Sequence, residues 1–205
     1  MNALLLKDWY VLIRQSKLTM VIVIVFTIVG VASSTFFYAA VAAIVCVMLP
    51  LTTMAYDQMH HWDRFVIGLP IERKDVVRSK YLLALLALSL SVLMLAIVGF
   101  AFYLANDIAL ETVLFMLWTQ LVAGLFFLSV NYPIVIKMGF ERGRIWYIII
   151  TIPIVSLSGV LNSILDMESL SMHVSIRNFA YLIIPILLVI GSYLLSVRYM
   201  ESKEY

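Results

Sequence analysis

Six stretches of the chain are strongly apolar and contain no Asp, Glu, Lys, Arg or His, and this pattern restricts the fold more than any other feature of the sequence. A helix of about 20 apolar residues crosses a hydrocarbon core roughly 30 Å thick. We therefore expect six membrane spans, at residues 18–32, 36–56, 81–105, 112–136, 145–165 and 179–197. The first span is short and is separated from the second only by Ser33, Ser34 and Thr35, which predicts a tight hairpin. Residues 1–205 then form a single transmembrane domain of the all-α polytopic class.

The overall charge of the chain agrees with this class. Charged residues make up 13% of the chain and hydrophobic residues 64%, whereas soluble domains carry about 25% charged residues. A net charge of +2 is too small to indicate a nucleic-acid partner. The single cysteine, Cys46, lies in an apolar stretch, so no intrachain disulfide can form and packing is its expected role.

Nearly all of the positive charge falls on one side of the membrane when the chain is threaded through six spans. Thirteen of the fourteen Lys and Arg residues lie on the side of the N-terminus, and only Arg177 lies on the other. Lys and Arg in short loops are retained in the cytoplasm. The sequence therefore predicts a multi-pass plasma-membrane protein with both termini in the cytoplasm.

The absence of ionisable residues from the spans restricts the source of energy for any transport. Carriers driven by protons or sodium ions generally need buried ionisable groups or broken helices inside the membrane. The chain also lacks the glycine-rich loop with Lys and Ser or Thr that holds the phosphates of ATP. We therefore expect energy to enter from another chain, outside the bilayer.

No residue of the chain is predicted to be catalytic or to bind a metal. His60 and His61 are adjacent, so on a helix they diverge by about 100° and do not chelate one ion. Ser156 and Ser158 lack the preceding glycine of a nucleophile elbow, and no histidine lies in a span to act as a base. The chain is not expected to be an enzyme.

Residues 1–16 have the pattern of a helix that lies in the membrane interface. A broad apolar face is combined with a narrow polar strip, which consists of Lys7, Asp8, Arg14 and Gln15. Two interpretations stay open for this elbow helix. It could help to form a cytoplasmic docking surface, or it could be an anchor whose Trp9 and Tyr10 lie at the level of the headgroups.

One polar insert, residues 57–80, separates the second and third spans and contains five of the fourteen Lys and Arg residues. If helical, it could extend roughly 36 Å, at about 1.5 Å per residue. Proline disfavours helix at the preceding residue, so Gly68-Leu69-Pro70 predicts a break between two short helices. We expect the first at about 57–66 and the second from about Ile71 into the third span. Trp62 and Phe65 beside Asp63 and Arg64 suit a protein contact.

Short motifs along nearly the whole chain are similar to those of one transporter family. In the insert they are Tyr56-Asp57, Trp62-Asp63, Gly68-Leu69-Pro70, Arg73-Lys74, Val76-Val77 and Ser79-Lys80-Tyr81. Outside it they are Leu4-Leu5-Leu6-Lys7-Asp8-Trp9, Pro133 and Lys137-Met138-Gly139-Phe140-Glu141-Arg142-Gly143-Arg144. Their order and spacing resemble the short six-span permease subunits of ABC transporters of the type 2 export class. Some bacterial members export phenol-soluble modulins or other amphipathic peptides, and others confer resistance to peptide antibiotics.

The resemblance implies a bacterial permease that forms a homodimer and binds two copies of a cytosolic ABC ATPase, which would hold ATP and Mg. Residues 57–80 would be the coupling element. Its contact residues would be Asp57, His61, Trp62, Asp63, Arg64, Phe65, Leu69, Pro70, Arg73, Lys74, Ser79 and Lys80. A second contact to the ATPase would come from Lys7, Lys137, Glu141 and Arg142. The alternative for the basic residues of the insert is a topology signal, which does not account for Trp62, Phe65 and the Leu69-Pro70 break.

Polar side chains within the spans are few. Such residues bind neighbouring helices more often than substrate, and we expect this of Ser89, Ser91, Thr119, Gln120, Ser129, Asn131, Ser156, Ser158, Asn162, Ser163, Ser192 and Ser196. A translocation path between two permeases could use Gln120, Asn131 and Asn162 with surrounding aromatic residues and methionines. A path of that kind would suit an amphipathic peptide, a lipid or a hydrophobic drug.

Two functions follow as hypotheses. The first is the permease of an ATP-driven exporter that moves an amphipathic or hydrophobic cargo, such as a peptide, an antimicrobial or a drug, out of the cell. The second is a membrane assembly or immunity factor that binds a partner through the same insert without moving cargo.

Overall fold

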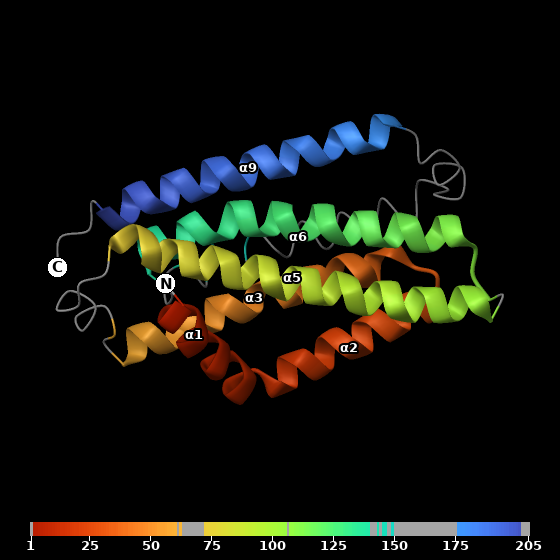
Figure 1. The fold of residues 1–205 in the computed structure, drawn as a ribbon, viewed down its shortest axis with the longest axis horizontal. Coiled ribbons are helices and arrows are strands. Elements are labelled where there is room, and N and C mark those ends of the chain that lie inside the picture. The colour runs from red at the N-terminus through yellow and green to blue at the C-terminus, as the bar shows by residue number, and fades with distance from the viewer. Residues whose placement is uncertain are drawn as a thin grey trace.

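The computed structural model describes residues 2–60, 62, 72–105, 107–139, 143, 145–146, 149 and 176–201. Its regular elements are all helices (Figure 1): α1 (Asn2–Gln15), α2 (Lys17–Ala32), α3 (Phe36–Met59), α5 (Arg73–Leu104), α6 (Leu110–Met138) and α9 (Ile176–Glu201). No strand occurs in these ranges. The all-α class predicted from the apolar stretches is confirmed.

Four of these helices are long and apolar enough to cross a membrane: α3, α5, α6 and α9. The α2 helix has only 16 residues, about 24 Å at 1.5 Å per residue, which is shorter than the hydrocarbon core. Together with α1 it would make a fifth span, bent by 76° at Ser16. The predicted span at 145–165 lies almost entirely outside the described residues, so the count of six stays a prediction.

The predicted hairpin between α2 and α3 is confirmed. The turn contains Ser34 at a φ of +52°, and the amide of Thr35 donates to the carbonyl of Gly30 over 3.1 Å. A methyl group added at Gly30 would lie 3.0 Å from the Cβ of Tyr38. Glycine therefore lets the two helices approach closely beside the turn.

The α3 helix lies at the centre of the bundle. It contacts α1, α2, α5 and α6, and 67% of its most apolar stretch is buried, against 17% for α9. Small side chains line its enclosed faces, and Ala39, Ala42 and Ala43 are almost completely buried. Because these side chains are short, neighbouring helices pack close to the α3 backbone.

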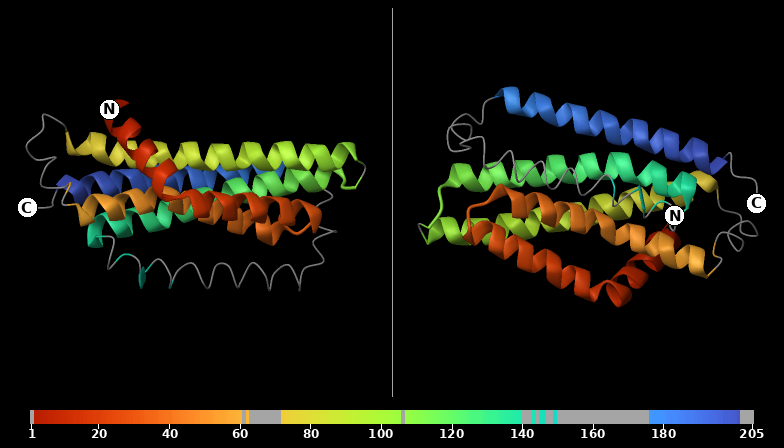
Figure 2. Two further views of the ribbon diagram at one scale, coloured as in Figure 1. Left: turned by 90° about the horizontal axis from the view of Figure 1, so that it is seen from below. Right: turned by 180° about the vertical axis from the view of Figure 1, so that it is seen from behind.

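One end of the bundle gathers most of the predicted cytoplasmic segments. Figures 1 and 2 show the N-terminus, the end of α3, the start of α5 and the end of α9 at the same end, opposite the end of α5 and the start of α6. The candidate functional site lies at this end of the molecule.

Candidate functional site

Four charged side chains meet where α1, α3 and α5 converge. We call Lys7, Asp8, Asp57 and Lys80 the charge cluster. The Nζ of Lys80 lies 2.8 Å from Oδ1 of Asp8 and 2.6 Å from Oδ2 of Asp57. The Nζ of Lys7 lies 2.6 Å from Oδ1 of Asp57 and 3.2 Å from Oδ1 of Asp8. Each lysine therefore pairs with both carboxylates, and the cluster links three helices.

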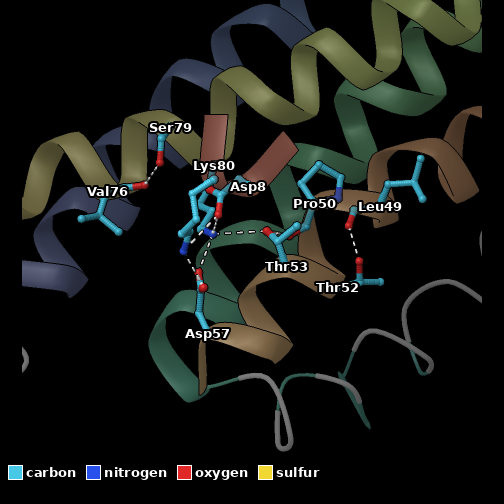
Figure 3. Close-up of polar contacts among 10 residues, drawn as sticks. Asp8, Leu49, Pro50, Thr52, Thr53, Asp57, Val76, Ser79 and Lys80 are labelled. Carbon is cyan, nitrogen blue, oxygen red and sulfur yellow. Dashed lines mark hydrogen bonds and ion pairs between the residues drawn. The ribbon is translucent and has the colours of Figure 1, made fainter. Parts of the chain in front are cut away.

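The local geometry of α3 prepares one wall of the cluster. Thr53 and Asp57 are four residues apart, so both side chains lie on the same face of the helix. The Thr53 hydroxyl donates to the carbonyl of Pro50 over 2.7 Å and accepts from the Nζ of Lys80 over 3.2 Å. Figure 3 shows Lys80 extending between Asp8 and Asp57, with Thr53 at its side. Lys80 thus uses its three donors on Asp8, Asp57 and Thr53.

The charge cluster is largely withdrawn from solvent. The side chains of Asp8 and Lys80 are 1% and 6% exposed, and those of Asp57 and Lys7 are 16% and 26% exposed. Burial of isolated charges costs several kcal/mol per ion, which pairing and hydrogen bonds must offset. Two lysines and two aspartates make the cluster neutral at pH 7, so no net charge is buried.

The charge cluster contains the two end residues of the insert, Asp57 and Lys80, and it also contacts Trp62 inside the insert. The Nζ of Lys7 lies 4.1 Å from the centroid of the Trp62 ring, which is the geometry of a cation–π contact. Trp62 is partly buried. Lys7 therefore connects the bulky residue predicted to contact an ATPase with the buried carboxylates on α1 and α3.

A small cavity of about 60 Å³ adjoins the charge cluster. Its walls come from α3, α5, α6, α9 and Trp62, and they include Asp57, Gln58, Lys80, Val135 and Met200. The cavity lies between α3 and α5, which hold Asp57 and Lys80 of the cluster, and α6 and α9. A rearrangement of Trp62 or Lys80 would therefore change the packing between these two parts of the bundle.

The structure shows that the insert is less separate from the spans than predicted. Asp57 does not open a new helix, because α3 continues without interruption through Met59. The basic residues from Arg73 to Lys80 form the first two turns of α5, a single helix of 32 residues. The predicted continuation into the third span is thus confirmed, and Asp57 and Lys80 face each other from the ends of adjacent spans.

The remaining predicted contact residues of the insert are only partly described. Lys74 is exposed, with its Nζ 3.6 Å from Oε1 of Glu201, and Ser79 is buried and donates to the carbonyl of Val76. The structure does not bring either into the charge cluster. The predicted residues outside the described part are His61, Asp63, Arg64, Phe65, Leu69, Pro70, Glu141, Arg142, Asn162 and the side chain of Arg73.

The chain leaves α6 at a glycine. Gly139 ends the helix at a φ of +79°, and its carbonyl accepts a hydrogen bond from the amide of Gly143 over 2.9 Å. A methyl group added at Gly139 would lie 3.3 Å from Nε2 of Gln58.

The Nζ of Lys137 lies 4.8 Å from the ring centroid of Tyr199 on α9. Lys137 therefore contacts α9 rather than the charge cluster.

Two of the residues predicted for a translocation path are enclosed within the single chain. Gln120 is fully buried, and its Nε2 donates to the hydroxyl of Ser91 on α5. Asn131 is 1% exposed, and its Nδ2 donates to the carbonyl of Phe127 in its own helix over 3.0 Å. In this packing Gln120 joins α5 to α6.

The prediction that polar side chains of the spans bind neighbouring helices is confirmed in part. Ser192, Ser196, Ser91 and Gln120 do so. In contrast, Ser89, Thr119, Ser129 and Asn131 donate to carbonyls of their own helices, and Ser156, Ser158, Asn162 and Ser163 lie outside the described residues. The Tyr81 hydroxyl on α5 lies 2.7 Å from Oγ of Ser192 and 2.8 Å from Oγ of Ser196 on α9. The two serines are one helical turn apart, which places both on one face. This contact ties α9 to α5 one residue after the charge cluster.

The sequence analysis missed the roles of Asp8 and Thr53. Asp8 was assigned to the polar strip of an interfacial helix, whereas the structure buries it against Lys80. The available signal was weak: a Thr and an Asp four residues apart near the end of a span, and a Lys at the start of the next. Nothing in the sequence pairs these residues with Asp8, which lies 72 positions before Lys80.

Comparison with known proteins identifies a family for almost the whole chain. The model of a family described as ABC-2 family transporter protein matches residues 3–201. No curated protein and no solved structure matches the chain. The matched range includes every helix of the described structure from α2 to α9 and nearly all of α1.

Proposed function

This chain belongs to the ABC-2 transporter family, and from this premise we propose that it is the permease of an exporter for an amphipathic or hydrophobic cargo. Membership makes it a multi-pass membrane component of an ABC transporter that works with an ATPase subunit. The proposal adds the direction of transport, the class of cargo and the route by which work reaches the membrane helices. In this proposal ATP and Mg bind to the partner ATPase.

The observation that carries the proposal is the contact of Trp62 with the charge cluster. Trp62 lies in the insert that we propose as the coupling element, 57–80, and its ring stacks on Lys7. Lys7 pairs with Asp8 and Asp57, and both carboxylates pair with Lys80. A displacement of Trp62 is therefore transmitted to the middle of α1 and to the adjoining ends of α3 and α5.

The ion pairs favour movement of these three helix segments as one body. Separating them would leave buried charges unpaired, which costs about 3–5 kcal/mol for one broken buried pair. Apart from the hydroxyl contacts of Tyr81 with α9, the packing against α6 and α9 near the cavity is mostly apolar, and apolar contacts tolerate sliding more readily than paired charges do. We propose that closure of two docked ATPases moves α1, α3 and α5 relative to α6 and α9.

The proposed assembly contains two permeases and two ATPases, with both termini of the permease in the cytoplasm. Its support is the large apolar surface that α9 leaves open to lipid or to a second permease. This surface consists of the exposed side chains of Ile183, Ile186, Leu187, Ile190 and Leu194. The uncharged spans suit a cargo that is itself partly apolar. Cross-linking of the purified permease measures the copy number directly.

The proposed role of the insert is tested by separating ATP hydrolysis from transport. The permease and its ATPase are co-purified and reconstituted in liposomes, and ATP-dependent movement of a fluorescent amphipathic helical peptide is measured with ATP hydrolysis. We expect Trp62→Ala to reduce peptide movement per ATP at least tenfold, because buried aromatic anchors at interfaces contribute about 2 kcal/mol or more. Trp62→Phe retains an aromatic face for Lys7 and should be affected less.

Trp146→Ala is the matched control, because Trp146 is exposed and lies outside the charge cluster. Normal coupled transport by Trp62→Ala would refute the coupling role. The assay also separates the second hypothesis, a non-transporting assembly or immunity factor. ATP-dependent movement of any cargo by the wild-type pair excludes that function.

A further inference from the structure

A second cavity lies away from the charge cluster, inside the bend between α1 and α2. Figure 1 shows these helices meeting at an angle on one side of the bundle. The cavity has a volume of about 150 Å³, and α3 and α5 complete its walls. Its lining includes Trp9, Leu12, Met20, Ile24 and Leu90.

The lining offers almost nothing to a polar ligand. Its two polar side chains, Cys46 and Ser91, are both hydrogen-bonded already: the Cys46 thiol donates to the carbonyl of Ala87 over 3.0 Å, and the Ser91 hydroxyl accepts from Gln120. An apolar cavity of roughly 150 Å³ stays dry and admits a molecule the size of benzene. This cavity is therefore suited to about six carbons of a hydrocarbon chain.

Two basic side chains lie at the bend itself. Arg14 lies in the last turn of α1 and Lys17 begins α2, and both are exposed. No carboxylate in the described part of the chain forms an ion pair with either, since Asp8 and Asp57 are occupied by Lys7 and Lys80. The bend thus presents positive charge that is free to bind an anion.

The positive charge of Lys17 and the α2 residues that line the cavity lie on one face of α2. Lys17, Met20 and Ile24 follow the spacing i, i+3, i+7, so they lie on one face of the helix. At 1.5 Å per residue, Met20 and Ile24 lie about 4 and 10 Å beyond Lys17. An anionic phospholipid carries its charge at one end and its acyl chain beyond it. Its headgroup can therefore lie at Lys17 while its acyl chain lies beside Met20 and Ile24. Trp9 adds an indole, which favours the headgroup level.

We propose that this cavity binds one acyl chain of an anionic phospholipid whose headgroup pairs with Lys17 and Arg14. The lipid belongs to the leaflet on the side of the charge cluster. By filling the space between α1, α2 and α5, it stabilises the bend at Ser16. This inference concerns lipid binding by the permease alone and does not depend on the cargo or on the coupling role of the insert.

Trp9 provides a direct readout, because bromine atoms on an acyl chain quench a tryptophan that they contact. The full-length permease is titrated in micelles with phosphatidylglycerol or phosphatidylcholine brominated on the acyl chain. The Trp9 signal is the difference between the wild type and Trp9→Phe. We expect phosphatidylglycerol to be bound roughly 25-fold more tightly, since each of the two basic residues contributes about a fivefold factor toward anionic lipid. Lys17→Gln should lower this preference about fivefold, to the part that Arg14 provides, and Arg198→Gln, at an exposed cation on α9, should leave it unchanged.

A second pair of variants tests the apolar part. Leu90 lines the cavity and is 51% exposed, while Leu93 on the same helix is 59% exposed and does not line it. Leu90→Phe should fill the mouth and reduce quenching of Trp9 by both lipids, whereas Leu93→Phe should not. Equal quenching of the wild type by both lipids, or a preference that Lys17→Gln does not reduce, would overturn the proposal. Displacement of the brominated chain by an equimolar amphipathic peptide would assign the cavity to cargo and also overturn it.

Discussion

Lys80 is the residue whose replacement tests the charge cluster most directly. Lys80→Met keeps an unbranched apolar side chain as far as Cε and removes the charged ammonium group. In the variant, Asp8 would be left almost fully buried with only Lys7 nearby, 3.2 Å away. Asp57 would keep Lys7 at 2.6 Å and is partly exposed, so its loss is smaller. The main effect is therefore a buried negative charge at Asp8 that only Lys7 offsets in part.

The expected loss of stability follows from these burials. Breaking a buried ion pair costs about 3–5 kcal/mol, and the remaining contact of Asp8 with Lys7 favours the lower end. We expect Lys80→Met to lower the free energy of unfolding by about 3 kcal/mol. Lys7→Met leaves both aspartates paired with Lys80 and removes a more exposed charge, so about 1 kcal/mol is expected.

A double-mutant cycle isolates the interaction between Lys80 and Asp8. Asp8→Asn keeps the shape of the side chain and removes the charge that Lys80→Met leaves unpaired. The double variant should therefore be more stable than the sum of the single effects predicts, by about 2 kcal/mol. The measurement is unfolding of the purified permease in mixed micelles with increasing sodium dodecyl sulfate, followed by circular dichroism.

The salt dependence of the stability of the wild type tests whether the ion pairs of the charge cluster are shielded from solvent. Because buried pairs are screened little by salt, its stability should change little between low and high ionic strength. A loss below about 1 kcal/mol in Lys80→Met, combined with no coupling to Asp8→Asn, would refute the reasoning. That result would mean that water, rather than the lysine, satisfies the carboxylates.

Three further substitutions test the packing of the spans by the same unfolding measurement. Tyr81→Phe removes a buried hydroxyl bonded to two serines of α9 and should lose about 1 kcal/mol, and no loss would show that this contact is not formed. Gly99→Ala should lose about 1 kcal/mol, because its methyl group would lie 2.6 Å from Cγ1 of Val113, a branched side chain with little freedom to rotate. Gly191→Ala is its control, since nothing lies within 4 Å of the added methyl group, and it should be neutral or slightly stabilising. Gly139→Ala should lose about 1–3 kcal/mol, because a φ of +79° with a ψ of 165° is a conformation reserved almost entirely for glycine; unchanged stability would mean that this turn is not maintained.

Much of the fold could be predicted from local patterns. The apolar stretches predicted helices at the positions of α2, α3, α5, α6 and α9, and the three residues between the first two stretches predicted their hairpin. Such predictions succeed because helix formation uses hydrogen bonds between residues four apart, and hydropathy is likewise a local sum. The boundary of α3 was less predictable, because the polar side chain of Asp57 suggested an early end to the helix.

The sequence predicted several residues of the candidate site but not how they pair with one another. The resemblance to type 2 export permeases implies that Trp62, Asp57, Lys80 and Lys7 contact an ATPase. The structure pairs Lys7, Asp57 and Lys80 with one another and buries Lys80 at 5% exposure. Whether a charge faces a partner or the interior depends on which helix ends meet, and no local pattern contains that information.

The sequence by itself determined that this chain is a membrane protein built from helices, because uncharged apolar stretches of this length have no other stable state in a bilayer. It also determined that these helices contain no buried ionisable groups within the predicted spans. Only the tertiary structure decided that Asp8, Asp57 and Lys80 form one cluster, since their positions along the chain differ by 23 and 72 residues. Ion pairing acts through space, over a few ångströms, so it is decided when α1, α3 and α5 pack together.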